Sequence, residues 1–140
     1  MPSASFSLQQ SIFATLTADT ALTTLLGGAR IYDDVPQGTA LPYLTLGQTT
    51  ERDWSTGGDP DTDAGAEHIL TLHVWSDARG KKQAHEILAA VRTALHDAPL
   101  TLTGHSLVNL RHEFSEARRG PDGETMHGLA RFRAVTEPSE

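Results

Sequence analysis

Histidine is the most chemically versatile residue type in this chain, because neutral imidazole binds metal ions and transfers protons near neutral pH. Seven histidines are present. Their local spacing predicts no site, since His68 and His73 are five residues apart on an expected strand and so point to opposite faces. A site built from distant strands, for example His73 with His112 or His127, stays open. Scattered histidines are the simpler interpretation.

Carboxylates form two further patterns. Asp33 and Asp34 are adjacent, which suits paired acid–base chemistry but suits a solvated turn better. Asp59, Asp61 and Asp63 alternate as in a calcium-binding loop. Such a loop needs glycine at its sixth position and glutamate at its twelfth, and alanine and leucine stand there instead. The pattern therefore indicates an acidic loop rather than a calcium site.

Motifs for nucleophilic catalysis and for phosphate binding are absent from the sequence. The chain contains no cysteine, so thiolate chemistry and disulfides are excluded. Neither a nucleophile elbow nor a glycine-rich phosphate loop is present. The sequence therefore predicts no enzymatic activity, no cofactor and no resident metal. One alternative is a small enzyme or ligand-binding domain whose site combines distant residues such as His73, His112 and Glu113.

The net charge of −7 is unevenly distributed along the 140 residues. Residues 1–78 contain two arginines and ten carboxylates, whereas residues 79–133 contain nine lysines or arginines and six carboxylates. Such a chain can pair its acidic half with the basic half of a neighbouring copy, and chance clustering on a soluble surface explains the pattern equally well. The overall acidity disfavours tight nucleic-acid binding, which needs a dense basic patch.

A chain of this length suits one domain. No apolar stretch approaches the roughly 20 residues that span a bilayer, and the N-terminal sequence has no basic region typical of a signal peptide. We therefore expect no membrane partner, and synthesis and assembly in the cytoplasm.

Hydrophobic periodicity and turn residues predict an α+β fold, with one domain over residues 1–140. Helices are expected over residues 7–18, between Asp19 and Gly27, and over 81–97; strands are expected over 30–33, 43–51, 67–76, 107–116 and 125–136. The strands should form a mostly antiparallel central sheet with the helices packed on one face. Residues 52–66, rich in Gly, Asp and Pro, should be an extended acidic loop at the end of a long hairpin arm.

Three local features sharpen this prediction. Ser7 followed by Gln10 fits a capping box, so the first helix should begin there. The strand over 67–76 carries apolar residues on both faces and should be central in the sheet. In the strand over 107–116, alternation places Val108, Leu110, His112 and Phe114 on one face.

Short motifs distributed over nearly the whole chain carry a family resemblance. They are Ile31–Gly38, Leu41–Gly47, Leu70–Ser76, Arg79–Lys82, Leu95–Leu100 and Phe132–Glu137. In this order they resemble the tail terminators of long-tailed phages and of phage-derived gene transfer agents. The resemblance implies an α+β domain that forms a hexameric ring on the head-proximal end of the tail tube. Such a ring stops tube polymerisation and joins the tail to the head connector.

The resemblance and the charge pattern together suggest residues for assembly. Basic Arg79, Lys81 and Lys82 would meet the acidic half of the next copy, and Arg118 and Arg119 at a hairpin tip are either an exposed turn or a partner contact. Acidic Asp53, Asp59, Asp61 and Asp63 would line a lumen through which DNA passes as non-specific cargo, because negative charge repels phosphates. Trp54 would anchor the arm on the tube or the neck, unless it folds back on its own sheet.

The expected partners are further copies of the chain, the tail tube protein and the head–tail connector or stopper. The protein would lie at the tail neck of a virion or of a gene-transfer-agent particle, and the sequence does not separate these two. The main alternative within this class is a head-completion or connector-stopper ring protein of the neck.

Overall fold

The computed structural model describes residues 3–53, 65–77 and 80–138. The helices are α1 (Ala4–Ala18), α2 (Thr20–Leu26) and α3 (Lys82–Leu95); the strands are β1 (Ile31–Tyr32), β2 (Tyr43–Asp53), β3 (Ala66–Ser76), β4 (His105–Arg119) and β5 (Met126–Pro138). The strands form one sheet in the order β1-β2-β3-β5-β4. Only β1 and β2 are parallel, and the other neighbours are antiparallel.

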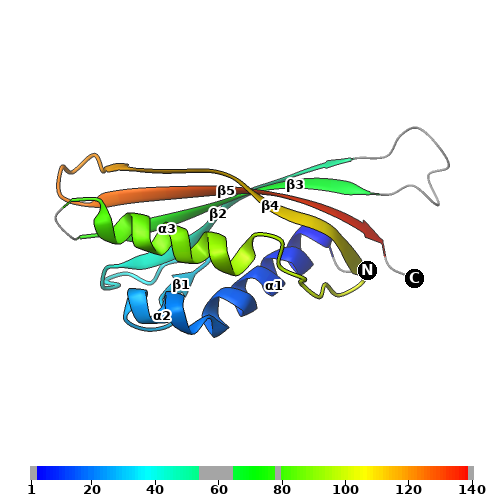
Figure 1. Ribbon diagram of the computed structural model, residues 1–140, viewed down its shortest axis with the longest axis horizontal. Helices are drawn as coiled ribbons and strands as arrows, with labels where there is room; N and C mark the ends of the chain where they lie inside the picture. Colours follow the sequence, from blue (N-terminus) through cyan, green and yellow to red (C-terminus); the bar gives the residue numbers. More distant parts are fainter. Residues whose placement is uncertain (1–2, 54–64, 78–79, 139–140) are drawn as a thin grey trace.

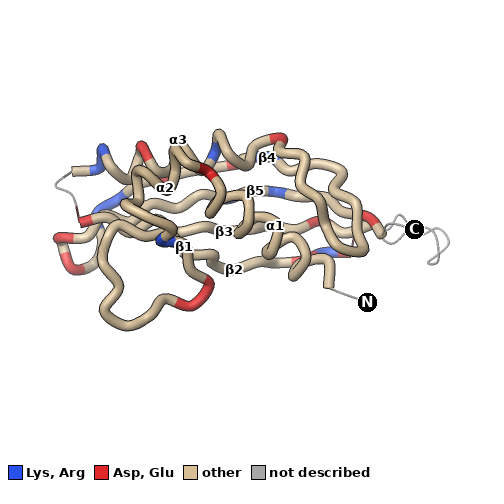
Figure 2. The backbone as a smooth tube through the Cα atoms, turned by 90° about the horizontal axis from the view of Figure 1, so that it is seen from below, with Lys and Arg blue, Asp and Glu red and all other residues tan. Residues whose placement is uncertain are grey.

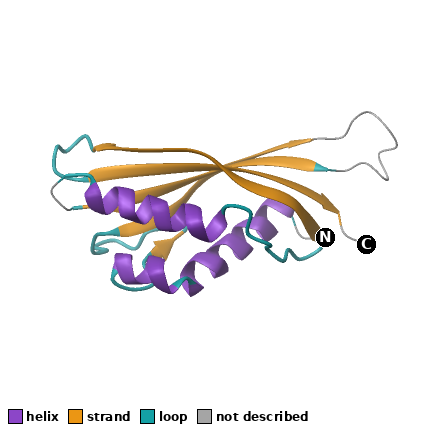
Figure 3. Ribbon diagram, in the orientation of Figure 1, coloured by secondary structure: helices purple, strands orange, loops and turns teal. Residues whose placement is uncertain are grey.

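All three helices cover one face of this sheet and leave the opposite face without a helical layer (Figures 1 and 3). The predicted α+β class, the antiparallel majority of the sheet and the central place of β3 are confirmed. No helix in the described ranges is long and apolar enough to cross a membrane.

The ends of the first two helices follow from capping chemistry. Ser3 caps α1 by accepting a hydrogen bond from the Phe6 amide at 3.3 Å. The prediction that Ser7 begins this helix is wrong: Ser7 is buried within the helix and donates to the Thr103 carbonyl at 3.0 Å. Asp19 caps α2 as predicted, through the Leu22 amide at 2.9 Å.

The core lies between the helices and the sheet. Its fully buried members include Leu8, Leu16, Leu22, Leu44, Val74, Ile87, Val91, Leu95 and Phe132. Gly128 of β5 lets α3 approach closely, because a Cβ there would lie 3.1 Å from Leu88 Cδ1. Contacts of α1 and α3 with the sheet therefore fix the position of both sheet edges.

Strand β4 departs from strict alternation at two places. Its register with β5 shifts between Leu107 and Asn109 and again between His112 and Phe114. Each shift is an irregularity of the β-bulge kind that changes which face the following residues occupy. The prediction that Phe114 shares the face of Leu110 is therefore wrong: Leu110 is buried under the helices, whereas Phe114 pairs with Arg131 on the other face.

Candidate functional site

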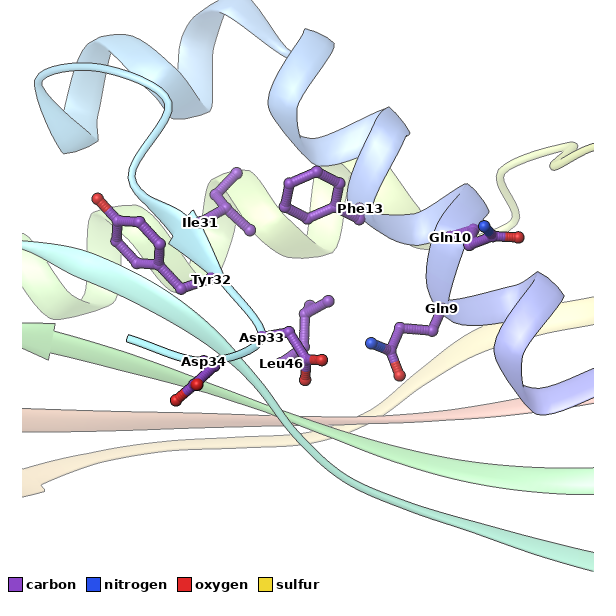
Figure 4. A pocket seen from close by; sticks show the side chains of 8 residues that line it. All are labelled: Gln9, Gln10, Phe13, Ile31, Tyr32, Asp33, Asp34 and Leu46. Carbon is purple, nitrogen blue, oxygen red and sulfur yellow. The ribbon is translucent and has the colours of Figure 1, made fainter. Parts of the chain in front are cut away.

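A pocket of about 340 Å³ lies where α1 meets the β1–β2 edge of the sheet. Gln9, Gln10 and Phe13 of α1 line one side, and Ile31, Tyr32, Asp33, Asp34 and Leu46 line the other (Figure 4). Its lining is mostly apolar, and β1 is only two residues long, so the pocket lies beside a part of β2 that no strand covers. We call this feature the α1–β1 groove.

The surface around the α1–β1 groove is apolar with an acidic rim. Helix α1 contains no charged residue, and Phe6 and Phe13 are 55% and 40% exposed. Asp33 and Asp34 are exposed, and neither has an ion-pair partner among the residues that the structure describes. Exposed aromatic rings beside uncompensated carboxylates are the composition of a docking surface rather than of a catalytic site.

The opposite edge of the sheet has the complementary composition. Val108 and Phe114 of β4 are 50% and 42% exposed. Together with Phe6 and Phe13 they are the large exposed hydrophobic residues of the described ranges. The Arg131 guanidinium lies over the Phe114 ring, 5.6 Å from its centroid. Helix α3 and β4 contain five lysines or arginines and three glutamates, whereas residues 31–53 contain four carboxylates and one arginine. Figure 2 shows α3 and β4 on one side of the molecule and β1 on the other.

Three stacked rings stand on the face of the sheet that the helices leave uncovered. The His127 ring lies between Trp75, at a centroid distance of 4.3 Å, and His73, at 5.0 Å. His73 Nδ1 and His127 Nε2 share a hydrogen bond of 2.8 Å. Gly47 of β2 makes room for this arrangement, because a Cβ at that position would lie 2.7 Å from His73 Cδ2.

Burial lowers the pKa of His73 below its ordinary value. Burial also lowers the pKa of His127, as do His73 and Arg118 nearby, against the opposing influence of Glu116. Both rings are therefore neutral at pH 7, which the shared hydrogen bond requires, since one imidazole donates and the other accepts. The stack forms a surface of aromatic and polar rings. It is not a metal site, because no group of three His, Cys, Asp or Glu residues that could hold a metal ion converges in the described ranges.

A second histidine network ties α1 to the sheet. His68 is fully buried, and its Nε2 lies 2.9 Å from the Thr136 hydroxyl. The Ser5 hydroxyl lies 3.1 Å from His68 Nδ1 and donates to Glu51 at 2.8 Å. Burial lowers the pKa of His68, opposed by Glu51 and assisted by His105. The network therefore positions the start of α1 on β2, β3 and β5.

Five of the ten residues predicted for assembly lie within the described ranges. Asp53 ends β2, Lys81 and Lys82 are exposed at the start of α3, and Arg118 and Arg119 are exposed near the end of β4. Arg119 donates to the Gly123 carbonyl at 3.0 Å, which holds the hairpin turn. Trp54, Asp59, Asp61, Asp63 and Arg79 lie outside the described residues.

The distant-residue site proposed as an alternative is not assembled. His73 belongs to the uncovered face, whereas His112 pairs with Phe132 on the helix side and contacts its ring edge-on at a centroid distance of 5.4 Å. Glu113 occupies the register shift of β4 between His112 and Phe114, and it lines a shallow surface with Arg131. Of the histidine pairs considered from the sequence, only His73 and His127 meet.

Sequence reasoning missed the α1–β1 groove and the exposed rings on both edges. A signal existed for the groove: residues 4–18 carry no charge, and Phe6 and Phe13 lie seven residues apart, away from the buried stripe. No comparable signal existed for the histidine–tryptophan stack, because it depends on the register between β3 and β5.

Comparison with known proteins decides the family. Residues 10–137 match the tail completion protein gp17 family. The chain belongs to this family. One similar solved structure is a chain of the virion of a native gene transfer agent particle, with 33% sequence identity and a TM-score of 0.87. The match covers 98% of this chain and 99% of that one. No curated protein matches the chain.

Family membership gives the predicted resemblance a firm basis. The protein is a tail completion protein of the phage and gene-transfer-agent type and a structural virion protein. For such a protein the surfaces that matter are those that meet other proteins, so the two sheet edges and the uncovered face of this tail completion protein are the candidate functional site.

Proposed function

We propose that this protein is a tail terminator, which forms a ring of copies at the head-proximal end of the tail tube. The ring stops tube polymerisation and joins the tail to the head connector, and it catalyses no reaction. The observation that carries the proposal is the likeness, over essentially the full length of both chains, to a chain of a gene-transfer-agent virion. Opposite edges of complementary composition support it, because a head-to-tail contact between unlike surfaces closes into a ring when the rotation between copies divides the full circle.

Tube length is the direct test of this function. Tail tube protein that polymerises in vitro should give shorter tubes with rising amounts of the purified protein, and electron microscopy should find added density at one end. Tubes of unchanged length and bare ends would contradict the proposal. A connector-stopper of the neck, the alternative function, would instead bind the head connector and leave tube length unchanged.

The charged ends of α3 and β4 are proposed to strengthen the ring. Lys81 and Lys82 are exposed and lie on the basic side of the molecule, and Arg79 belongs to the same sequence motif. Replacing Lys81 and Lys82 with glutamate should weaken ring formation and make it less sensitive to salt, because the attraction between copies is lost. Replacing the exposed His85 with alanine is the matched control, and light scattering measures the mass of the particle.

The acidic arm is proposed to line the passage for DNA. Asp53 ends β2 at the base of the arm, and Asp59, Asp61 and Asp63 follow in the sequence. Changing these four to asparagine should slow or block DNA transfer by assembled particles, because phosphates would no longer be repelled. The control neutralises four exposed carboxylates elsewhere, Asp77, Glu86, Glu124 and Glu137. Equal transfer by both variants would remove the arm from this role.

A further inference from the structure

The four large exposed hydrophobic residues of the described ranges divide into two pairs. Phe6 and Phe13 stand on α1 beside the α1–β1 groove, and Val108 and Phe114 stand on β4. The sheet order places β1 and β4 at opposite edges, so the two pairs cannot cover each other within one chain. Each pair is therefore available to a partner from outside the chain, and the two surfaces are unlike.

Charge makes these two edges complementary. The groove has Asp33 and Asp34 on its rim, within a segment of four carboxylates and one arginine. On β4, Phe114 has charged neighbours of both signs in the strand, Arg111 and Arg118 with Glu113 and Glu116, and Arg131 packs over its ring and leaves an excess of positive charge there. Two copies placed with their groove edges together would face acid to acid, which costs free energy. The groove edge of one copy attracts the β4 edge of another, and this contact can be repeated from each copy to the next.

The register of the sheet sets the height at which unlike edges meet. Leu46 of β2 lines the groove and pairs with Leu72 of β3. Across the next two strands, Leu72 pairs with Ala130 of β5, and Ala130 pairs with Ser115 of β4. Phe114 is the next residue along β4, so the exposed ring and the groove lie at the same level across the molecule. Copies related by rotation about a ring axis stay at equal height when their strands run along that axis. This arrangement brings the Phe114 ring of one copy to the groove of the next.

We propose that the α1–β1 groove binds the β4 edge of a second copy, with Phe114 inserted between α1 and the end of β1. Pairing of backbone edges is disfavoured as the main contact, since β4 carries two register shifts and several charges, which are features that protect an exposed edge. The contact is therefore made by side chains: an aromatic anchor in an apolar groove, with arginines against the acidic rim. This inference rests on the proposed ring and specifies how its copies join.

The absence of cysteine from the chain makes cross-linking a clean test. Gln10→Cys puts a thiol on the groove, and Glu113→Cys puts one beside Phe114, while both aromatic residues stay in place. The two single variants are mixed, assembled on tail tubes and treated with a short bismaleimide. Ser106→Cys is the matched control, because it lies exposed on the same strand about 23 Å from position 113 at 3.3 Å per residue.

The expected result is a covalent dimer from the mixture of Gln10→Cys with Glu113→Cys and none from either variant alone. The double variant should give a ladder of covalent oligomers that ends at the closed ring. Ser106→Cys should not link to Gln10→Cys. Dimers from Glu113→Cys alone would overturn the inference, because two β4 edges would then be in contact. Equal linking of Ser106→Cys to Gln10→Cys would also overturn it, because the groove would then meet a different part of β4.

Removing the anchor tests the energetics. Phe114→Asp should weaken association between copies by about 30-fold or more, as expected for a central aromatic contact, and should leave the monomer folded because this ring lies outside the core. Rings that form normally with Phe114→Asp and without the predicted cross-link would overturn this contact and leave the proposed ring intact. Copies that never assemble, alone or on tubes, would overturn both.

Discussion

The two faces of the sheet use the same strands for different purposes. The helix-covered face carries Phe132, Val74 and Leu110 in an apolar core. The uncovered face carries rings and charges that hold one another: His73 on His127, Arg131 on Phe114, and Arg133 bonded to Glu67 at 2.6 Å. Burial of apolar area drives folding, so the covered face should determine stability. The uncovered face and the sheet edges are then free to carry residues selected for assembly.

The largest expected effect separates these two roles directly. Phe132→Ala on the covered face should lower the free energy of unfolding by about 3–5 kcal/mol, because it leaves a cavity in the core. Phe114→Ala on the uncovered face should lower it by at most about 1 kcal/mol, the value of its contact with Arg131. Urea denaturation of both variants measures the difference. Equal losses would mean that the uncovered face also stabilises the monomer.

The next effect concerns the polar exception in the covered face. His68→Ala should cost about 1–3 kcal/mol, because the buried Thr136 hydroxyl loses its partner. The lowered pKa of His68 means that folding favours the neutral ring. Its contribution is therefore complete above the unfolded pKa of about 6.5 and is lost as the pH falls below it.

Denaturation curves between pH 8 and pH 5 test this sign. The wild-type protein should lose stability on acidification, since the pKa values of His73, His112 and His127 are lowered as well. His68→Ala should show a shallower loss, and His85→Ala on the exposed side of α3 is the control. A wild-type protein that becomes more stable in acid would contradict the assignment.

A smaller effect belongs to the uncovered face. A double-mutant cycle on His73 and His127, each changed to alanine, should give a coupling free energy of about 0.5–1.5 kcal/mol at pH 8, the value of one hydrogen bond. The coupling should weaken or reverse once the pH falls below the lowered pKa values of the two rings, because two protonated imidazoles repel and neither can accept a hydrogen bond. Coupling that does not change with pH would indicate ring stacking alone.

The sequence predicted the elements of the fold more reliably than the relations between them. Apolar residues at helical spacing, as in α3, and the turn signals located the helices and strands, because these features depend on residues close in the chain. The start of α1 was misplaced because Ser3 and Ser7 both fit an N-cap, and burial of Ser7 against Thr103 decides between them. The face of Phe114 was wrong because a register shift leaves no mark in the alternation of residues.

The candidate site was less predictable than the fold. Charge asymmetry and the exposed positions of Lys82 and Arg118 were readable from the sequence. The uncharged exposed side of α1 was readable too, but the shape of the α1–β1 groove was not, because it depends on β1 ending at Tyr32 while β2 continues to Asp53. Leu46 and Phe114 lie at the same level of the sheet because of three successive strand pairings, β2 with β3, β3 with β5 and β5 with β4. Such relations belong to the sheet as a whole, and no local pattern encodes them.

The smallest expected effect compares two positions on one helix. Phe13→Ser should lower the free energy of unfolding by about 1 kcal/mol or less, because this ring is 40% exposed and lies outside the core. Leu16→Ala, less than one turn away on the buried side, should cost about 2–5 kcal/mol. If Phe13→Ser leaves the monomer stable and abolishes its assembly on tubes, the exposed aromatic residue is retained for contact with another copy. A loss of stability like that of Leu16→Ala would instead make Phe13 part of the core and remove the reason to expect a partner there.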